Sequence, residues 1–289
     1  MTVHPFIEAE KTAGHSVKRV CEPLQVSRAA YYHRRTAAPS PRAVGDAELT
    51  ERITDAHRAS RGSYGAPRVH AVLIRGGARV GRRRVARLMR AAGLVGRHRR
   101  HGKRTTVPDP HARLRPDLVG RDFTPGPAPM TRWCGDITYL PTDQGRLFLA
   151  TVIDIATRKV VGWATADHLR TELVADALRD AVRRQRPDTG TIFHSDRGCQ
   201  YTSHEFALIA TEFGIRLSVG RTGQCWDNAP AESFFATLKN DLGARPPRPT
   251  RAAARADVFK YIEARYNIRR LHSSLGYRTP VEYEAALAA

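Results

Sequence analysis

The strongest constraint on the fold comes from the second half of the chain, where the apolar pattern changes its period several times. Strand-like segments occupy 132–142, two stretches of 146–165 on either side of a turn at 156–158, 191–196 and 216–220. Segments with helical spacing occupy 167–185, 203–215 and 227–242. The order βββαβαβα predicts an α/β fold, a mixed five-stranded sheet with flanking helices.

Two aspartates mark one edge of this predicted sheet. Asp136 lies in the first strand and Asp196 ends the fourth. Strand ends in such sheets often carry the ligand site, so the two carboxylates face each other if their strands are neighbours. With a third acid they could hold two Mg²⁺ ions about 3.5–4 Å apart, an arrangement suited to phosphoryl transfer. Without metal the acids repel, and at least one pKa should rise.

A helix that follows the last strand carries a candidate third acid. The stretch "WDNAPAESFFATLKNDL" (226–242) offers Asp227 or Asn228 as N-cap and Pro230 for the first turn. Glu232 then falls in that first turn, and Lys239 is seven residues later on the same helix face. A plain solvated surface would also explain this pair. The helix packs through an apolar stripe of Phe234, Phe235, Leu238 and Leu242.

The net charge separates the two halves of the chain. The formal charge is +20, and residues 1–131 hold 26 Lys and Arg against 10 Asp and Glu. Residues 132–289 hold 22 against 18. An excess this large indicates a polyanionic partner, for which nucleic acid is the default. Arginine-rich codon usage is the alternative, but it would not concentrate the excess in one half.

The basic half has helical patterns. Residues 16–35 predict a helix, a turn and a second helix capped by Ser27, followed by a linker at 36–46. Helices at 46–58, 67–75 and 81–93 predict a second helix-turn-helix. Twelve Lys and Arg and no acid lie between Arg75 and Arg104. Arginines on the last helix are predicted to contact DNA phosphates: Arg82, Arg83, Arg84, Arg87 and Arg90.

Other sequence features indicate the cellular compartment of the protein. The four cysteines, at 21, 134, 199 and 225, form no CxxC pair, so free or buried thiols are expected. The chain has no apolar run of membrane length and no signal-like N-terminus. These observations predict a cytoplasmic protein.

The sequence motifs around the three acids resemble those of a known family. The contexts are "WCGDITYL", "FHSDRGCQYTS" and "WDNAPAESFFATLKNDL", with 59 and 35 residues between Asp136, Asp196 and Glu232. They are similar to the DDE core of OrfB-type bacterial insertion-sequence transposases (the insertion-sequence-three group), relatives of retroviral integrases. The tail "YNIRRLHSSLGYRTPVEYE" (266–284) and "SYGAPRVHAVL" (63–73) resemble the family's C-terminal motif and helix-turn-helix.

The resemblance implies an RNase H-like fold and a DNA transposase. Asp136, Asp196 and Glu232 would be catalytic metal ligands for Mg²⁺ (or Mn²⁺), with two ions expected, and Lys239 would contact DNA. The partner would be double-stranded DNA, both element ends and target, bound by a homo-oligomer in the bacterial nucleoid. Members of this family are often fused to an upstream partner, OrfA, which carries a leucine zipper, but this chain has no sustained heptads. It could therefore be the downstream product, a part of a fusion, or a version that works alone. The residues leave two alternatives open: an RNase H-like nuclease and a non-catalytic DNA-binding regulator.

These patterns divide the chain into five expected parts. They are an N-terminal helix-turn-helix segment (1–45), a basic helix-turn-helix domain (46–104), a linker (105–131), the integrase-like core (132–245) and a helical tail (246–289).

Several residues near the motifs have open roles. His194 shares a strand face with Asp196. Its side chain could lie near the scissile phosphate or orient a metal ligand, or it could make a structural hydrogen bond. Asp154 is expected to turn a hairpin or pair with Arg158, although a supporting role in the site is also open. In the tail, three polar residues could contact DNA or lock the last helices to the core: Asn267, Arg270 and His272.

Overall fold

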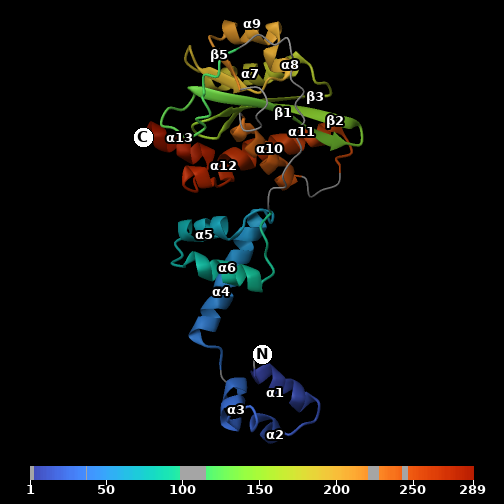
Figure 1. Cartoon of the computed structure of the whole chain (residues 1–289), viewed down its shortest axis with the longest axis vertical. Coiled ribbons are helices and arrows are strands. Elements are labelled where there is room, and N and C mark those ends of the chain that lie inside the picture. The colour runs from blue at the N-terminus through green and yellow to red at the C-terminus, as the bar shows by residue number, and fades with distance from the viewer. Residues whose placement is uncertain (1–2, 37, 98–114, 221–227, 243–246) are drawn as a thin grey trace. The chain divides into compact units, whose positions relative to one another are not determined.

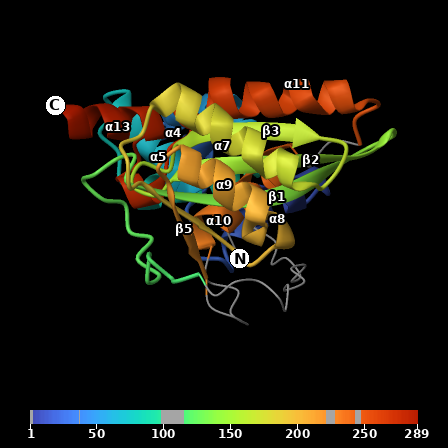
Figure 2. The same cartoon turned by 90° about the horizontal axis from the view of Figure 1, so that it is seen from above.

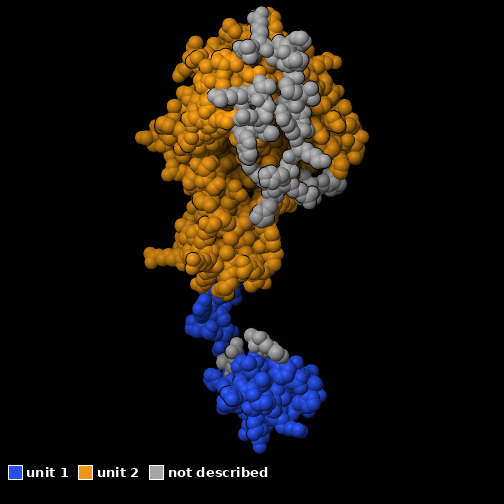
Figure 3. All heavy atoms as spheres, in the orientation of Figure 1, with its two compact units in different colours: residues 1–55 blue, residues 56–289 orange. Residues whose placement is uncertain are grey.

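The computed structural model describes residues 3–36, 38–97, 115–220, 228–242 and 247–289. The chain divides into two compact units, residues 1–55 and residues 56–289, shown in blue and orange in Figure 3. The basic stretch 97–117 lies mostly outside the described residues.

The second unit is built on a five-stranded mixed sheet (Figure 1). Its strands are β1 (Arg132–Thr142), β2 (Gly145–Asp154), β3 (Val160–Ala166), β4 (Ile192–Ser195) and β5 (Arg216–Val219). The sheet order is β3-β2-β1-β4-β5. The first three strands are antiparallel neighbours, whereas β4 runs parallel to both β1 and β5. The predicted strands and their mixed arrangement are therefore confirmed.

Helices cover both faces of this sheet (Figure 2). One face packs against α7 (Thr171–Gln185), α8 (Cys199–Thr202) and α9 (His204–Glu212). The other face packs against α10 (Ala229–Leu242) and α11 (Arg251–Tyr261). Ser203 caps α9 by accepting a hydrogen bond from the Phe206 amide. The short helix α8 was not predicted, because four residues are too few to show a period.

The helices contact the sheet closely enough to require glycine in β3. A Cβ atom at Gly162 would lie 2.4 Å from the backbone nitrogen of Ala181 on α7. The small residues Ala177 and Ala181 on the facing side of α7 are both buried, which lets helix and strand approach.

The first unit is a small helical cluster. It holds α1 (Val3–Thr12), α2 (Val17–Cys21), α3 (Arg28–Thr36) and the start of α4 (Pro41–Ala59). Its core contains Ile7, Val17, Cys21 and Tyr31. Ser27 Oγ accepts a hydrogen bond from the Ala30 amide, so the expected cap is present. The expectation of a linker through residue 46 was wrong, because α4 already begins at Pro41, a residue well suited to a first turn.

The predicted basic helix pair is present in the second unit. Helix α5 (Ala66–Arg75) begins after Gly65, and α6 (Arg82–Ala91) follows a glycine-containing turn. The two helices bury apolar residues spaced three and four apart: Val69, Leu73, Val85, Leu88 and Met89. This burial leaves most of the arginines of α6 on its outer surface.

The tail is helical and irregular. After α11 come a π-helical turn (Ile262–Tyr266), α12 (Asn267–Arg269), a 3₁₀ turn (Ser273–Leu275) and α13 (Pro280–Ala288). Thr279 and Glu282 form a capping box at the start of α13. The tail contacts α5: the Leu271 amide donates to Tyr64 Oη at 2.9 Å, and Arg68 Nε donates to the Leu271 carbonyl at 3.1 Å.

Candidate active site

The register of β1 and β4 brings the two predicted aspartates to one edge of the sheet. Cys134 of β1 is paired with His194 of β4 in a parallel ladder. Asp136 and Asp196 each follow two residues later, so each emerges just beyond the last paired position. The condition set by the sequence analysis, that the strands of the two aspartates are neighbours, is met.

Asp136 is in a strongly perturbed environment. Its Oδ1 accepts a hydrogen bond from the Ile137 amide at 2.7 Å, which favours the carboxylate. Burial has the larger effect, and with the nearby charges of Asp196 and Glu232 it raises the pKa of Asp136 to about 8. The side chain nevertheless keeps partial access to solvent. A carboxyl group of this kind favours an added positive charge beside it.

Asp196 is held by the backbone that follows β4. Its Oδ1 accepts a hydrogen bond from the Gly198 amide at 3.0 Å. This contact closes a local turn before α8 and aims the carboxyl group at the sheet edge.

Helix α10 places Glu232 near the two aspartates. Phe234 and Leu238 are buried against the sheet, while Glu232 on the opposite side is exposed. Burial and the charge of Asp196 raise the pKa of Glu232. In addition to burial, the charge of Asp196 thus raises the pKa of both Asp136 and Glu232, the direction expected for acids that lie near one another without a metal.

The start of α10 is tied directly to β1. The carbonyl of Asn228 accepts the first helical hydrogen bond, from Glu232, so Asn228 occupies the predicted N-cap position; Asp227 lies outside the described residues. The Asn228 side chain does not cap the helix. Its Nδ2 donates to the Gly135 carbonyl at 2.8 Å, one residue before Asp136. This bond sets the distance between the helix that carries Glu232 and the strand that carries Asp136.

Lys239 shares the exposed face of α10 with Glu232, as expected from their spacing. Partial burial lowers the pKa of Lys239, while the negative charge of Asp136 opposes that shift. Its Nζ lies 5.4 Å from the centre of the Tyr139 ring. The ammonium group is therefore beside the acids without forming an ion pair with them in the described part of the chain.

The donor set suits a hard divalent cation. Carboxylate oxygens are the ligands that Mg²⁺ prefers, and their mutual repulsion favours such an ion. Within the described ranges, no three His, Cys, Asp or Glu side chains are already gathered around one point. Glu232 is the exposed member of the set, whereas Asp136 and Asp196 are half-buried.

His194 is part of the packing beneath the site. The ring is buried, and its Nδ1 lies 2.8 Å from Ser218 Oγ on β5. Phe123 contacts the ring edge-on, with centroids 5.7 Å apart. The structural hydrogen bond considered for His194 is present, and its role beside the metal ligands stays a prediction.

Asp154 turns the hairpin between β2 and β3. It is fully buried and accepts hydrogen bonds from the Thr157 amide and hydroxyl and from the Met130 amide. The guanidinium of Arg158 instead donates to the Phe123 carbonyl. The hairpin role is confirmed.

The polar residues of the tail lock it to the core. Asn267 uses both its amide oxygen and nitrogen to pair with the backbone of Val160, each at 3.0 Å, and so extends the edge of β3. Arg270 donates to Asp241 Oδ2 at 2.7 Å, and both side chains are buried. Burial among arginines lowers the pKa of His272 to about 3, which leaves it neutral. Of the two roles considered, packing is the observed one.

Asp241 was missed by the sequence analysis. It lies on α10 two residues after Lys239, and Arg265, Arg270 and Tyr261 of the tail converge on its carboxylate. Its position three residues after the buried Leu238 was the available signal, because a carboxylate on an apolar stripe needs partners.

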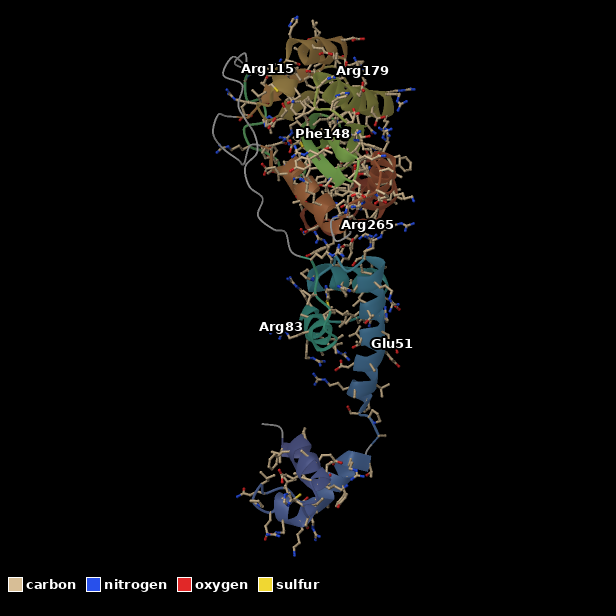
Figure 4. All side chains as sticks on the ribbon, turned by 90° about the vertical axis from the view of Figure 1, so that its right-hand side faces the viewer. Glu51, Arg83, Arg115, Phe148, Arg179 and Arg265 are labelled. Carbon is tan, nitrogen blue, oxygen red and sulfur yellow. The ribbon has the colours of Figure 1, made fainter. Side chains whose placement is uncertain are left out.

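The arginines predicted to bind DNA differ in their exposure to solvent. Arg82, Arg83, Arg87 and Arg90 are exposed along α6, whereas Arg84 is half-buried. Figure 4 shows Arg83 projecting outward from this helix. An exposed row of this kind suits contacts to a phosphate backbone.

Family models match most of the chain. An HTH-like domain covers residues 45–102, and two integrase core domain models cover 126–225 and 213–280. In the solved structures, the catalytic core domain of BIV integrase aligns with 54% of this chain and 95% of that chain, at 18% identity and a TM-score of 0.41.

Curated relatives match over nearly their whole length. The transposase for insertion sequence element IS904 of Lactococcus lactis is 37% identical, covering 87% of this chain and 98% of the relative. The transposase InsF for insertion sequence IS3A of Escherichia coli is 35% identical, covering 96% and 97%. A putative transposase for IS986/IS6110 of Mycobacterium tuberculosis is 37% identical, covering 92% and 97%. No described helix is long and apolar enough to span a membrane.

These matches favour a transposase over the nuclease and regulator alternatives. The RNase H-like sheet and the helix-turn-helix agree with the same assignment. The chain belongs to the IS3 family of insertion-sequence transposases, polynucleotidyl transferases with an HTH-like domain and an integrase core.

Proposed function

We propose that this transposase cleaves the 3′ ends of its element and joins them to target DNA, with Asp136, Asp196 and Glu232 as the catalytic acids. The observation that carries the proposal is geometric: β1 and β4 are paired at Cys134 and His194, two residues before Asp136 and Asp196, and Asn228 ties the start of the helix of Glu232 to Gly135. Two Mg²⁺ ions (or Mn²⁺) held there would stabilise the charge that develops on phosphodiester oxygens.

The residues of the chain supply position and charge rather than a covalent nucleophile. The carboxyl of Asp136, with its raised pKa, would give up its proton when the cation binds. Lys239, on the same helix face as Glu232, would hold a phosphate beside the reacting one. The arginines of α6 would bind the duplex further away, with affinity that falls steeply with salt.

The proposal is tested by Glu232→Gln, assayed for joining of labelled element-end DNA in Mg²⁺. We expect strand transfer to be lost while DNA affinity changes little, because the substitution removes one ligand and keeps the shape of the side chain. Glu212→Gln is the matched control, since Glu212 is an exposed acid on α9 at the opposite face of the sheet. Joining near the wild-type rate by the Glu232 variant would refute the assignment.

We also propose that the protein self-associates on DNA, because two element ends must be handled together. The family resemblance adds an OrfA partner or fusion as a source of further DNA contacts. Sedimentation of the protein with element-end DNA, with and without OrfA, tests both. A strictly monomeric protein on paired ends would exclude self-association.

A further inference from the structure

Tyr139 presents an exposed ring on the strand that carries Asp136, with Lys239 from the helix of Glu232 beside it. It lies on β1 three residues after Asp136, and 43% of its surface is exposed. Two cations lie against the ring. The guanidinium carbon of Arg146 is 4.6 Å from the ring centroid, and Lys239 Nζ is 5.4 Å away.

The sheet register explains how this cluster forms. Tyr139 is paired with Phe148 on β2, and the two rings contact edge-on at 6.4 Å. Arg146 precedes Phe148 by two residues, so it lies diagonally across from Tyr139 on the same face. Lys239 approaches from α10. Figure 4 marks Phe148 within the sheet. The ring therefore joins an arginine of the sheet to the lysine on the helix of Glu232.

Among the residues that the structure describes, Arg146 and Lys239 differ from other basic residues of the core in their lack of an ion pair. Arg179 pairs with Asp176, Arg248 pairs with Asp257, and Arg184 pairs with two acids. Within the described part of the chain, neither Arg146 nor Lys239 has a carboxylate at ion-pair distance. The ring holds both groups in place without neutralising them, because its attraction for a cation comes from a quadrupole. Their charge stays available for an external anion.

We propose that Arg146 and Lys239, positioned by the Tyr139 ring, bind the phosphate backbone of the DNA strand whose scissile bond lies at Asp136. This inference rests on the proposed strand-transfer function. Charge complementarity selects the ligand, since two uncompensated cations beside a phosphodiester site match successive phosphates of one strand. Arg146 contacts the strand directly, whereas Tyr139 is a positioning residue that acts through both cations.

The experiment measures how the affinity for a labelled mixed-sequence duplex depends on salt. All variants are made in the Glu232→Gln background, so that loss of catalysis does not affect the result. Arg146→Gln should reduce the slope of log K against log salt by about 0.9, the value for one lost phosphate contact. Tyr139→Leu keeps both charges, so the slope should stay constant while binding weakens about 3- to 10-fold. Tyr139→Phe retains the ring and should bind as the parent does.

Arg179→Gln is the matched control, because it removes an exposed arginine that is already paired, on α7. For this variant, the slope of log K against log salt should equal that of the Glu232→Gln protein. The proposal is overturned if Arg146→Gln leaves the slope unchanged or matches Arg179→Gln. It is also overturned if Tyr139→Phe binds as weakly as Tyr139→Leu, since the hydroxyl and not the ring would then be responsible. Failure of strand transfer in the wild type would refute the proposed function and leave these binding results intact.

Discussion

Replacing Asp136 with Asn should make the metal-free protein more stable while abolishing strand transfer. The pKa of Asp136 is raised from 3.8 to about 8 in the folded protein. Between those values the unfolded chain releases a proton that the folded chain retains, so this group lowers stability as pH rises. At pH 7 the difference spans about 3 units, or about 4 kcal/mol at 1.36 kcal/mol per unit. Partial solvent access reduces the expected gain for Asn to about 2 kcal/mol.

Urea denaturation in EDTA measures this gain at pH 5 and pH 7.5. The stability difference between Asp136→Asn and the wild type should grow with pH, because only the wild type carries the titrating group. Saturating Mg²⁺ should then stabilise the wild type alone and narrow the difference. Asp176→Asn, at an exposed ion pair with Arg179, is the control and should change stability by less than about 1 kcal/mol. An Asp136 variant no more stable than the wild type at pH 7.5 would refute the reasoning.

Three further outcomes are expected. Asp241→Asn should lower the free energy of unfolding by about 3–5 kcal/mol, since it leaves the buried Arg270 without its partner; a loss under 1 kcal/mol in urea denaturation would contradict this. Gly162→Ala should lower the free energy of unfolding by about 1–3 kcal/mol, because the added Cβ would clash with the backbone of α7. Gly81→Ala, which has open space around the added Cβ, should change the melting temperature little. Arg87→Gln should reduce the salt slope of duplex binding by about 0.9 without changing sequence preference, and an unchanged slope would remove Arg87 from the interface.

Local pattern was sufficient to predict the strands and the mixed sheet, because strand and helix periods differ clearly after residue 132. The pairing of β1 with β4, on which the proximity of Asp136 and Asp196 depends, was left open by the sequence and comes from the structure. The sequence motifs around Asp136, Asp196 and Glu232 predicted the site through the family resemblance. The roles of the individual acids and of Lys239 as ligands and contact remain predictions.

What could not be predicted depends on contacts between distant segments. Asn228 looked like a helix cap, and only the position of β1 shows that its side chain bonds to Gly135 instead. Asp241 and Arg270 are 29 residues apart, and their pairing leaves no local signature. The start of α4 at Pro41 was missed because proline and alanine in the segment suggested a linker. Tertiary context decided each of these cases.

The tail has a consequence for how the protein is made. Arg265 donates to the Ser60 carbonyl at 2.5 Å and also lies 3.7 Å from Asp241 on α10 (Figure 4). The segment that joins the basic helices to the helix of Glu232 is thus translated about two hundred residues after Ser60. During synthesis the earlier helices form first, and their contacts with the tail can be made only after the tail leaves the ribosome. A message cut short before residue 262 would therefore yield a chain that lacks the Arg265 bridge between Ser60 and Asp241 of α10.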